Sequence, residues 1–130
     1  MFHRATRRAG VSVAAIALVA ATGAGAQDLA AAKKQFIASC GVCHAIEAGA
    51  LPRQGPNLIG VYGAKAARVE GFKYSPGLQK ADWVWDGERL DAWLADPKAV
   101  VADTVMVYRQ ADPAKRALVI AFLKSIGKQD

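Results

Sequence analysis

Residues that bind metals or carry redox chemistry are scarce in this 130-residue chain, which has two cysteines, two histidines and two methionines. Two cysteines can supply only one disulfide, so a framework of several bridges is excluded. The chain also lacks a block of Lys and Arg, an internal repeat and the alternating pattern of strands. These absences argue against a nucleic-acid surface, a repeat protein and a β-fold.

The first 26 residues have the pattern of an export signal and not of a folded segment. Arg4, Arg7 and Arg8 form a basic start, and 11–21 is an apolar stretch of about eleven residues, which is short for a membrane span. A small-residue cleavage site follows at 24–26. We therefore expect residues 1–26 to be a signal peptide and 27–130 to form the mature domain. An uncleaved membrane anchor is the alternative.

The mature chain is small and only weakly basic. Loss of three arginines leaves 14 basic residues against 11 acidic ones, a net charge of +3 on 104 residues. A domain of this size buries a modest share of its surface, so it usually needs a disulfide, a metal or a prosthetic group to stabilise it.

One short motif carries most of the chemical information. Cys40-Gly41-Val42-Cys43-His44 has the C-x-x-C-H spacing of a c-type haem attachment site. Each thiol can add to one vinyl group of the porphyrin, and the adjacent imidazole can then bind the iron. The alternatives are a redox dithiol and part of a zinc site. Zinc needs four ligands, whereas the mature chain offers only three candidates here.

The remaining pattern predicts a small all-α domain. Apolar spacing and capping residues predict a helix over 29–39 capped by Asp28, and helices that begin near Ser75, Asp86 and Asp112, with a further turn after Asp96. Gly127 suits the C-cap of the last helix. The glycine- and proline-rich stretch between these helices, 45–74, is expected to be a long loop ordered by a buried group.

A second iron ligand is expected at Met106. It is the methionine that remains in the mature chain, and His44 is the remaining histidine. Met106 lies between two predicted helices, where its thioether is free of helical constraint.

Several segments, in order, together resemble the class I cytochromes c of the mitochondrial-like, bacterial periplasmic type. They are Phe36 followed by the C-x-x-C-H motif, the Gly55-Pro56-Asn57-Leu58-Ile59-Gly60-Val61-Tyr62-Gly63 loop, Gly71-Phe72-Lys73-Tyr74-Ser75, the Trp85–Pro97 segment, Thr104-Val105-Met106, and the apolar last helix. The resemblance covers Asp28 to Lys124.

The resemblance implies a fold in which the first and last helices pack together, through Phe36 against Phe122 and Leu118, around one covalent haem c with long ordered loops. It implies that Cys40 and Cys43 attach the haem and that His44 and Met106 bind its iron. The Pro56 carbonyl would accept a hydrogen bond from His44, and Tyr74 and Trp85 would donate to a haem propionate.

The chain departs from the family pattern at Ala64, at Trp93 and in the Met106 loop. Ala64 stands where the family often has an arginine beside a propionate, and Lys65 and Arg68 are the nearby candidates to replace it. Trp93 replaces a tyrosine that often donates to the methionine sulfur. The Met106 loop lacks the usual Pro, Gly and Lys, which predicts a less rigid loop and a less basic rim.

The function implied is that of a monomeric periplasmic electron carrier and not of an enzyme. Its partners would be a donor dehydrogenase or bc-type complex and an acceptor oxidase or reductase, with no nucleic acid and no stable membrane insertion. Mitochondrial-like members of the family dock to their partners through a ring of lysines around the exposed haem edge. The resemblance implies that this chain keeps only part of that ring, at Lys34, Arg53 and Lys98. The rivals are a ligand-sensing haem protein, a cytochrome subunit of a dehydrogenase, and a haem-free dithiol protein.

Overall fold

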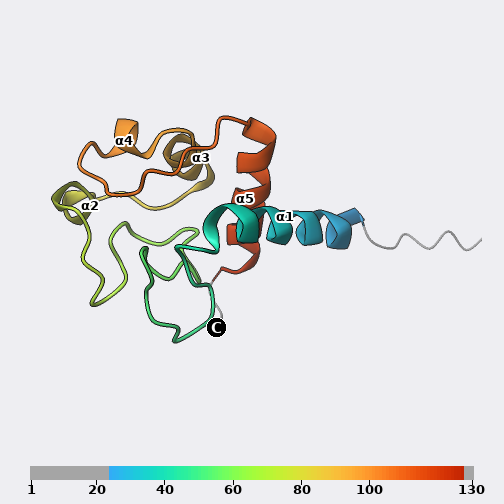
Figure 1. Cartoon of the computed structure of the whole chain (residues 1–130), viewed down its shortest axis with the longest axis horizontal. Coiled ribbons are helices and arrows are strands. Elements are labelled where there is room, and N and C mark those ends of the chain that lie inside the picture. The colour runs from blue at the N-terminus through green and yellow to red at the C-terminus, as the bar shows by residue number, and fades with distance from the viewer. Residues whose placement is uncertain (1–23, 128–130) are drawn as a thin grey trace, which may run out of the picture.

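The computed structural model describes residues 24–127, and these form five helices. They are α1 (Ala24–Cys40), α2 (Pro76–Lys80), α3 (Gly87–Ala95), α4 (Pro97–Val100) and α5 (Pro113–Ser125). Figure 1 shows α5 crossing α1, with α2, α3 and α4 grouped beyond the crossing and the long α1–α2 loop beneath them. Strand pairing among the described residues is limited to an isolated bridge between Lys65 and Val84. The predicted all-α class is confirmed.

Four helices begin at the capping residues that the sequence predicted. Each cap side chain accepts a hydrogen bond from a backbone N–H of the first turn, which would otherwise have no partner. The distances from the donating backbone N to the accepting side-chain oxygen are 3.4 Å for Leu78 to Ser75, 2.7 Å for Arg89 to Asp86, 3.4 Å for Ala99 to Asp96 and 2.8 Å for Ala114 to Asp112. These starts were predictable because the donor and acceptor are two or three residues apart.

Two predicted helix ends are wrong. Asp28 is not an N-cap, because α1 begins at Ala24 and Asp28 already lies inside the helix. The C-cap of α5 is Ile126 and not Gly127, and Gly127 does not adopt a positive φ. The chain ends α5 through the Ile126 N–H bonding to Phe122 O (3.1 Å), without a left-handed residue. Residues 1–23 of the predicted signal lie outside the described residues.

The core lies where α1 packs on α5. The Phe36 and Phe122 rings are 4.9 Å apart between centroids, as expected from the sequence. Ala32, Phe36 and Cys40 form the buried stripe of α1, at a spacing of four residues. Leu29 and Ile37 lie off this stripe, 45% and 53% exposed, although apolar spacing alone would also admit them.

The loop between α1 and α2 is ordered by its own hydrogen bonds. Buried Asn57 donates through Nδ2 to the carbonyls of Glu47 (2.7 Å) and Ala50 (3.2 Å) and accepts from the Ile59 N–H (2.9 Å). Further along, backbone bonds tie the 63–66 segment to 83–85. The loop therefore forms a fixed wall. In the part of the chain that the structure describes, no helix has the length and apolar character to span a membrane.

Candidate cofactor site

A mainly apolar cavity of about 250 Å³ is enclosed by the helices and the α1–α2 loop. Its lining includes all seven residues predicted for the site: Cys40, Cys43, His44, Pro56, Tyr74, Trp85 and Met106. They come from the end of α1 and the turn after it, from two points on the long loop, from two residues before α3 and from the α4–α5 loop. The fold thus brings together side chains up to 66 positions apart in the sequence.

The two cysteines lie at one end of this cavity, on the turn that ends α1. The N–H groups of Cys43 and His44 both bond to the Cys40 carbonyl, at 3.1 and 3.0 Å. The Cys43 thiol donates to Gln54 Oε1 (3.1 Å). Burial, with a smaller contribution from Cys43, raises the pKa of Cys40 to about 12. A redox dithiol needs a thiolate with a lowered pKa, so this environment argues against that alternative.

His44 is held in one orientation by the following loop. Its Nδ1 lies 2.8 Å from the Pro56 carbonyl oxygen. Burial lowers the pKa of His44, although the bond to Pro56 opposes this shift, so the neutral imidazole is favoured. Because a carbonyl can only accept, Nδ1 carries the proton and Nε2 keeps its lone pair. His44 is therefore prepared to donate Nε2 to a metal.

Gly55 makes this contact sterically feasible. A Cβ at position 55 would lie 2.3 Å from His44 Cε1, far inside van der Waals contact. Glycine at this position lets the loop backbone lie directly against the imidazole ring.

Met106 has a polar partner of its own. The indole N–H of buried Trp93, on α3, donates to Met106 Sδ at 3.2 Å. The sequence left open whether Trp93 could reach this sulfur, and the structure shows that it does. Buried Thr104 bonds through Oγ1 to the Met106 N–H (3.3 Å). One bond thus holds the Met106 sulfur and another its backbone.

The other end of the Met106 loop is held by Arg116 of α5. Its guanidinium bonds to Asp91 Oδ1 (2.7 Å) and to the carbonyls of Gln110 and Ala111 (both 3.0 Å). The Gln110 N–H also bonds to Leu94 O (2.8 Å). These anchors run against the expectation of a less rigid loop. The role of Arg116 could not be predicted from the sequence, because a charged residue in a helix carries no local sign of which loop it contacts.

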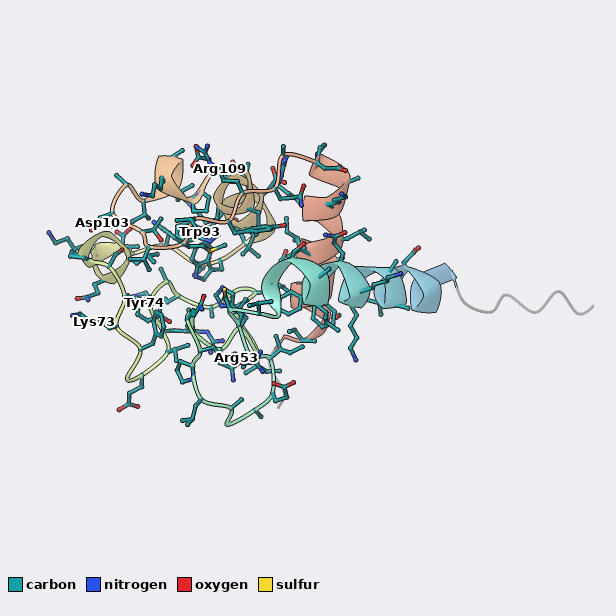
Figure 2. The ribbon with its side chains drawn as sticks, in the orientation of Figure 1. Arg53, Lys73, Tyr74, Trp93, Asp103 and Arg109 are labelled. Atoms are coloured by element: carbon teal, nitrogen blue, oxygen red, sulfur yellow. The ribbon has the colours of Figure 1, made fainter. Side chains whose placement is uncertain are left out.

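Tyr74 and Trp85 bring unpaired donors to the cavity. The Tyr74 hydroxyl accepts from the Val69 N–H (3.1 Å), and its pKa is raised by burial, against which Val69 and Arg68 act. Among the described residues, neither the Tyr74 O–H nor the Trp85 indole N–H has an acceptor. Both can therefore donate to an anionic group in the cavity. Figure 2 shows Trp93 and Tyr74 approaching this region from different segments.

Comparison with known proteins agrees with this geometry. The chain is 46% identical to cytochrome c2 iso-2 of Magnetospirillum fulvum over 88 residues, 67% of this chain and 91% of that protein. It is 36% identical to cytochrome c-550 of Novispirillum itersonii over 99 residues, 68% and 89% of the two chains. This chain belongs to the class I cytochromes c. No family model matches it.

The fold of this cytochrome c agrees with a solved relative. Cytochrome cH from Methylobacterium extorquens superposes with a TM-score of 0.68 at 43% identity, over 75% of this chain and 98% of that one. The expected family, fold and cofactor are confirmed: the protein binds one covalent haem c, carries electrons and is not an enzyme. The cavity fits this group, since it combines two thiols, a neutral imidazole, a thioether and free donors within apolar walls.

Proposed function

We propose that this cytochrome c is a monomeric periplasmic carrier. It accepts one electron from a dehydrogenase or bc-type complex and passes it to an oxidase or reductase. The haem supplies the redox chemistry, with its iron alternating between the ferrous and ferric states. We retain residues 1–26 as the export signal and 27–130 as the mature domain.

The residues that line the cavity have distinct roles in this proposal. Cys40 and Cys43 would attach the haem through two thioether links, and His44 Nε2 and Met106 Sδ would bind its iron. Pro56 fixes the His44 tautomer, and Tyr74 and Trp85 donate to a haem carboxylate. A thioether ligand favours a higher potential than bis-nitrogen or thiolate ligation, as a carrier between respiratory complexes requires.

The observation that carries the proposal is that both candidate ligands are held by hydrogen bonds before any cofactor is considered. His44 bonds to Pro56 at 2.8 Å and Met106 to Trp93 at 3.2 Å. Two fixed ligands leave no open position for a substrate or gas. This favours an electron carrier over a ligand-sensing haem protein, which needs a labile side.

Carbon monoxide distinguishes these two functions. We expect the reduced wild-type protein to give no CO difference spectrum on mixing, because Met106 occupies the iron, and to show one reversible one-electron couple. Haem should stay with the protein in acidified acetone, as covalent attachment requires. Prompt, stoichiometric CO binding by the wild type would favour the sensor instead. Tight co-purification with a dehydrogenase would indicate that the protein is a dedicated cytochrome subunit of that enzyme.

The surface beside Met106 predicts how a partner associates. Val105 and Val107, which flank the ligand, are 78% and 80% exposed and line the cavity mouth. Arg53 was a candidate for docking, but its Nη1 donates to Gly41 O at 2.7 Å, so it also holds the loop. An apolar rim on a chain of low net charge gives little electrostatic steering.

We therefore expect the rate of reduction by the native donor to fall only slightly as ionic strength rises, since surface charges are screened within about 8 Å at physiological salt. Stopped-flow measurements over a range of ionic strengths check this. Lys98→Glu, a charge reversal on α4, serves as the probe of the remaining basic patch. A steep decline with salt, together with severe slowing by Lys98→Glu, would show that this patch dominates docking.

A further inference from the structure

The segment that leads from α4 to Met106 has a single hydrogen bond to a distant part of the chain. Asp103 Oδ2 accepts from the Gly77 N–H of α2 at 2.9 Å, across 26 positions in the sequence. Among the described residues, the other hydrogen bonds of 101–105 join residues at most four positions apart. Figure 2 shows Asp103 beside α2. The bond to Gly77 is therefore what ties this segment to the rest of the fold.

The Asp103–Gly77 bond joins two walls of the cavity. Ser75 and buried Leu78 line the cavity from the side of α2, and buried Thr104 lines it together with Met106 from the other side. Asp103 precedes Thr104, whose Oγ1 in turn accepts from the Met106 N–H (3.3 Å). The bond thus limits how far the Met106 loop can move away from α2.

Gly77 is required by the Asp103 carboxylate and not by its own backbone conformation. It does not adopt a positive φ, and it lies in a helix, where glycine is less favourable than most residues. A Cβ at position 77 would lie 2.5 Å from Asp103 Oδ1 and 2.6 Å from Val101 Cγ1. The absence of a side chain at position 77 is what lets the carboxylate reach the backbone N–H.

We propose that Asp103 is a positioning residue for Met106: its bond to Gly77 keeps the Met106 loop against α2 and so limits loss of the thioether from the iron. The inference rests on the proposed function, in which Met106 Sδ is an axial ligand. The loop lacks the usual Pro and Gly, and the carboxylate of Asp103 supplies a tertiary contact that restrains it.

The expected effect is moderate, because Asp103 is exposed and water competes for both partners. Loss of one such hydrogen bond changes an equilibrium by about fivefold. The loop would keep its other anchors, the Trp93 bond to Met106 Sδ and the Arg116 bonds to Gln110 and Ala111. Removing the Asp103 carboxylate should therefore make loop opening more frequent without releasing the loop.

The experiment titrates imidazole into the oxidised holoprotein and follows the weak red-region band of the methionine–iron bond. Imidazole can bind only when Met106 has left the iron, so its apparent affinity measures how often the loop opens. We expect Asp103→Ala to bind imidazole about fivefold more tightly than the wild type. Asp103→Asn keeps an oxygen acceptor at the same position and should stay close to the wild type.

Two further variants separate positioning from a general loss of stability, each checked for native helicity by circular dichroism. Asp82→Ala removes another exposed carboxylate from the shallow groove that Gly77 and Asp103 also line, and Asp82 has no hydrogen-bond partner among the described residues. It should leave the imidazole affinity unchanged. Gly77→Ala displaces the Asp103 carboxylate and should tighten imidazole binding. Combined with Asp103→Ala, its effect should not add, because both substitutions break the same contact.

Wild-type imidazole affinity in Asp103→Ala would overturn the proposal, as would additive effects of Gly77→Ala and Asp103→Ala. An Asp103→Asn variant that binds imidazole as tightly as Asp103→Ala would also overturn it, since the charge and not the bond to Gly77 would then matter. Failure of the proposed function is distinguishable, because the wild type itself would then lack the methionine–iron band, whatever the affinity of the Asp103 variants.

Discussion

Met106→Ala should lose the weak red-region absorption band of the methionine–iron bond and admit water to the iron. The midpoint potential should fall by a sizeable share of the roughly 0.8 V over which axial ligands set haem potentials. The reason is that the thioether favours ferrous iron more strongly than water does. Optical spectra and a redox titration of the purified variant measure both effects. The ferrous variant should also bind CO promptly.

Two variants control this result. Val105→Ala truncates the neighbouring side chain, which is 78% exposed, and should leave band and potential unchanged. Trp93→Phe removes the donor 3.2 Å from the sulfur but keeps an aromatic ring, so the band should persist while Met106 is lost more readily on heating. An unchanged spectrum in Met106→Ala would show that another group binds the iron.

Without haem the chain should not fold. The mainly apolar lining of a cavity of about 250 Å³ would then lose the group that it packs against. The whole free energy of unfolding of such a domain is about 5–15 kcal/mol. The Cys40→Ala/Cys43→Ala variant, which cannot attach haem, should therefore have lost most of its helical circular dichroism and its cooperative thermal transition.

The matched control for this variant is Val42→Ala, in the same motif. Val42 is 79% exposed and leaves both thiols in place, so the variant should attach haem and keep native helicity. Full helicity in the haem-free double-cysteine variant would contradict the prediction and show that the α1–α5 core is sufficient by itself.

The sequence predicted best the features that depend on residues close together along the chain. Cys40, Cys43 and His44 are neighbours, so their spacing alone indicates haem attachment. The caps at Asp86 and Asp112 act on N–H groups two or three residues ahead, which makes them local as well. The same local reasoning failed at Asp28, because the residues before it continue the helix and the preference for capping was overridden.

The sequence by itself determined the class of cofactor, the all-α fold, most helix starts and Met106 as the candidate second ligand. Only the tertiary structure decided that Trp93 reaches the Met106 sulfur, that Arg116 holds the loop that carries it, and that Arg68 and not Lys65 is anchored beside the cavity. The physical reason is distance along the chain. Such contacts join residues 6 to 25 positions apart, and the packing of α1, α3, α5 and the long loop sets whether they meet.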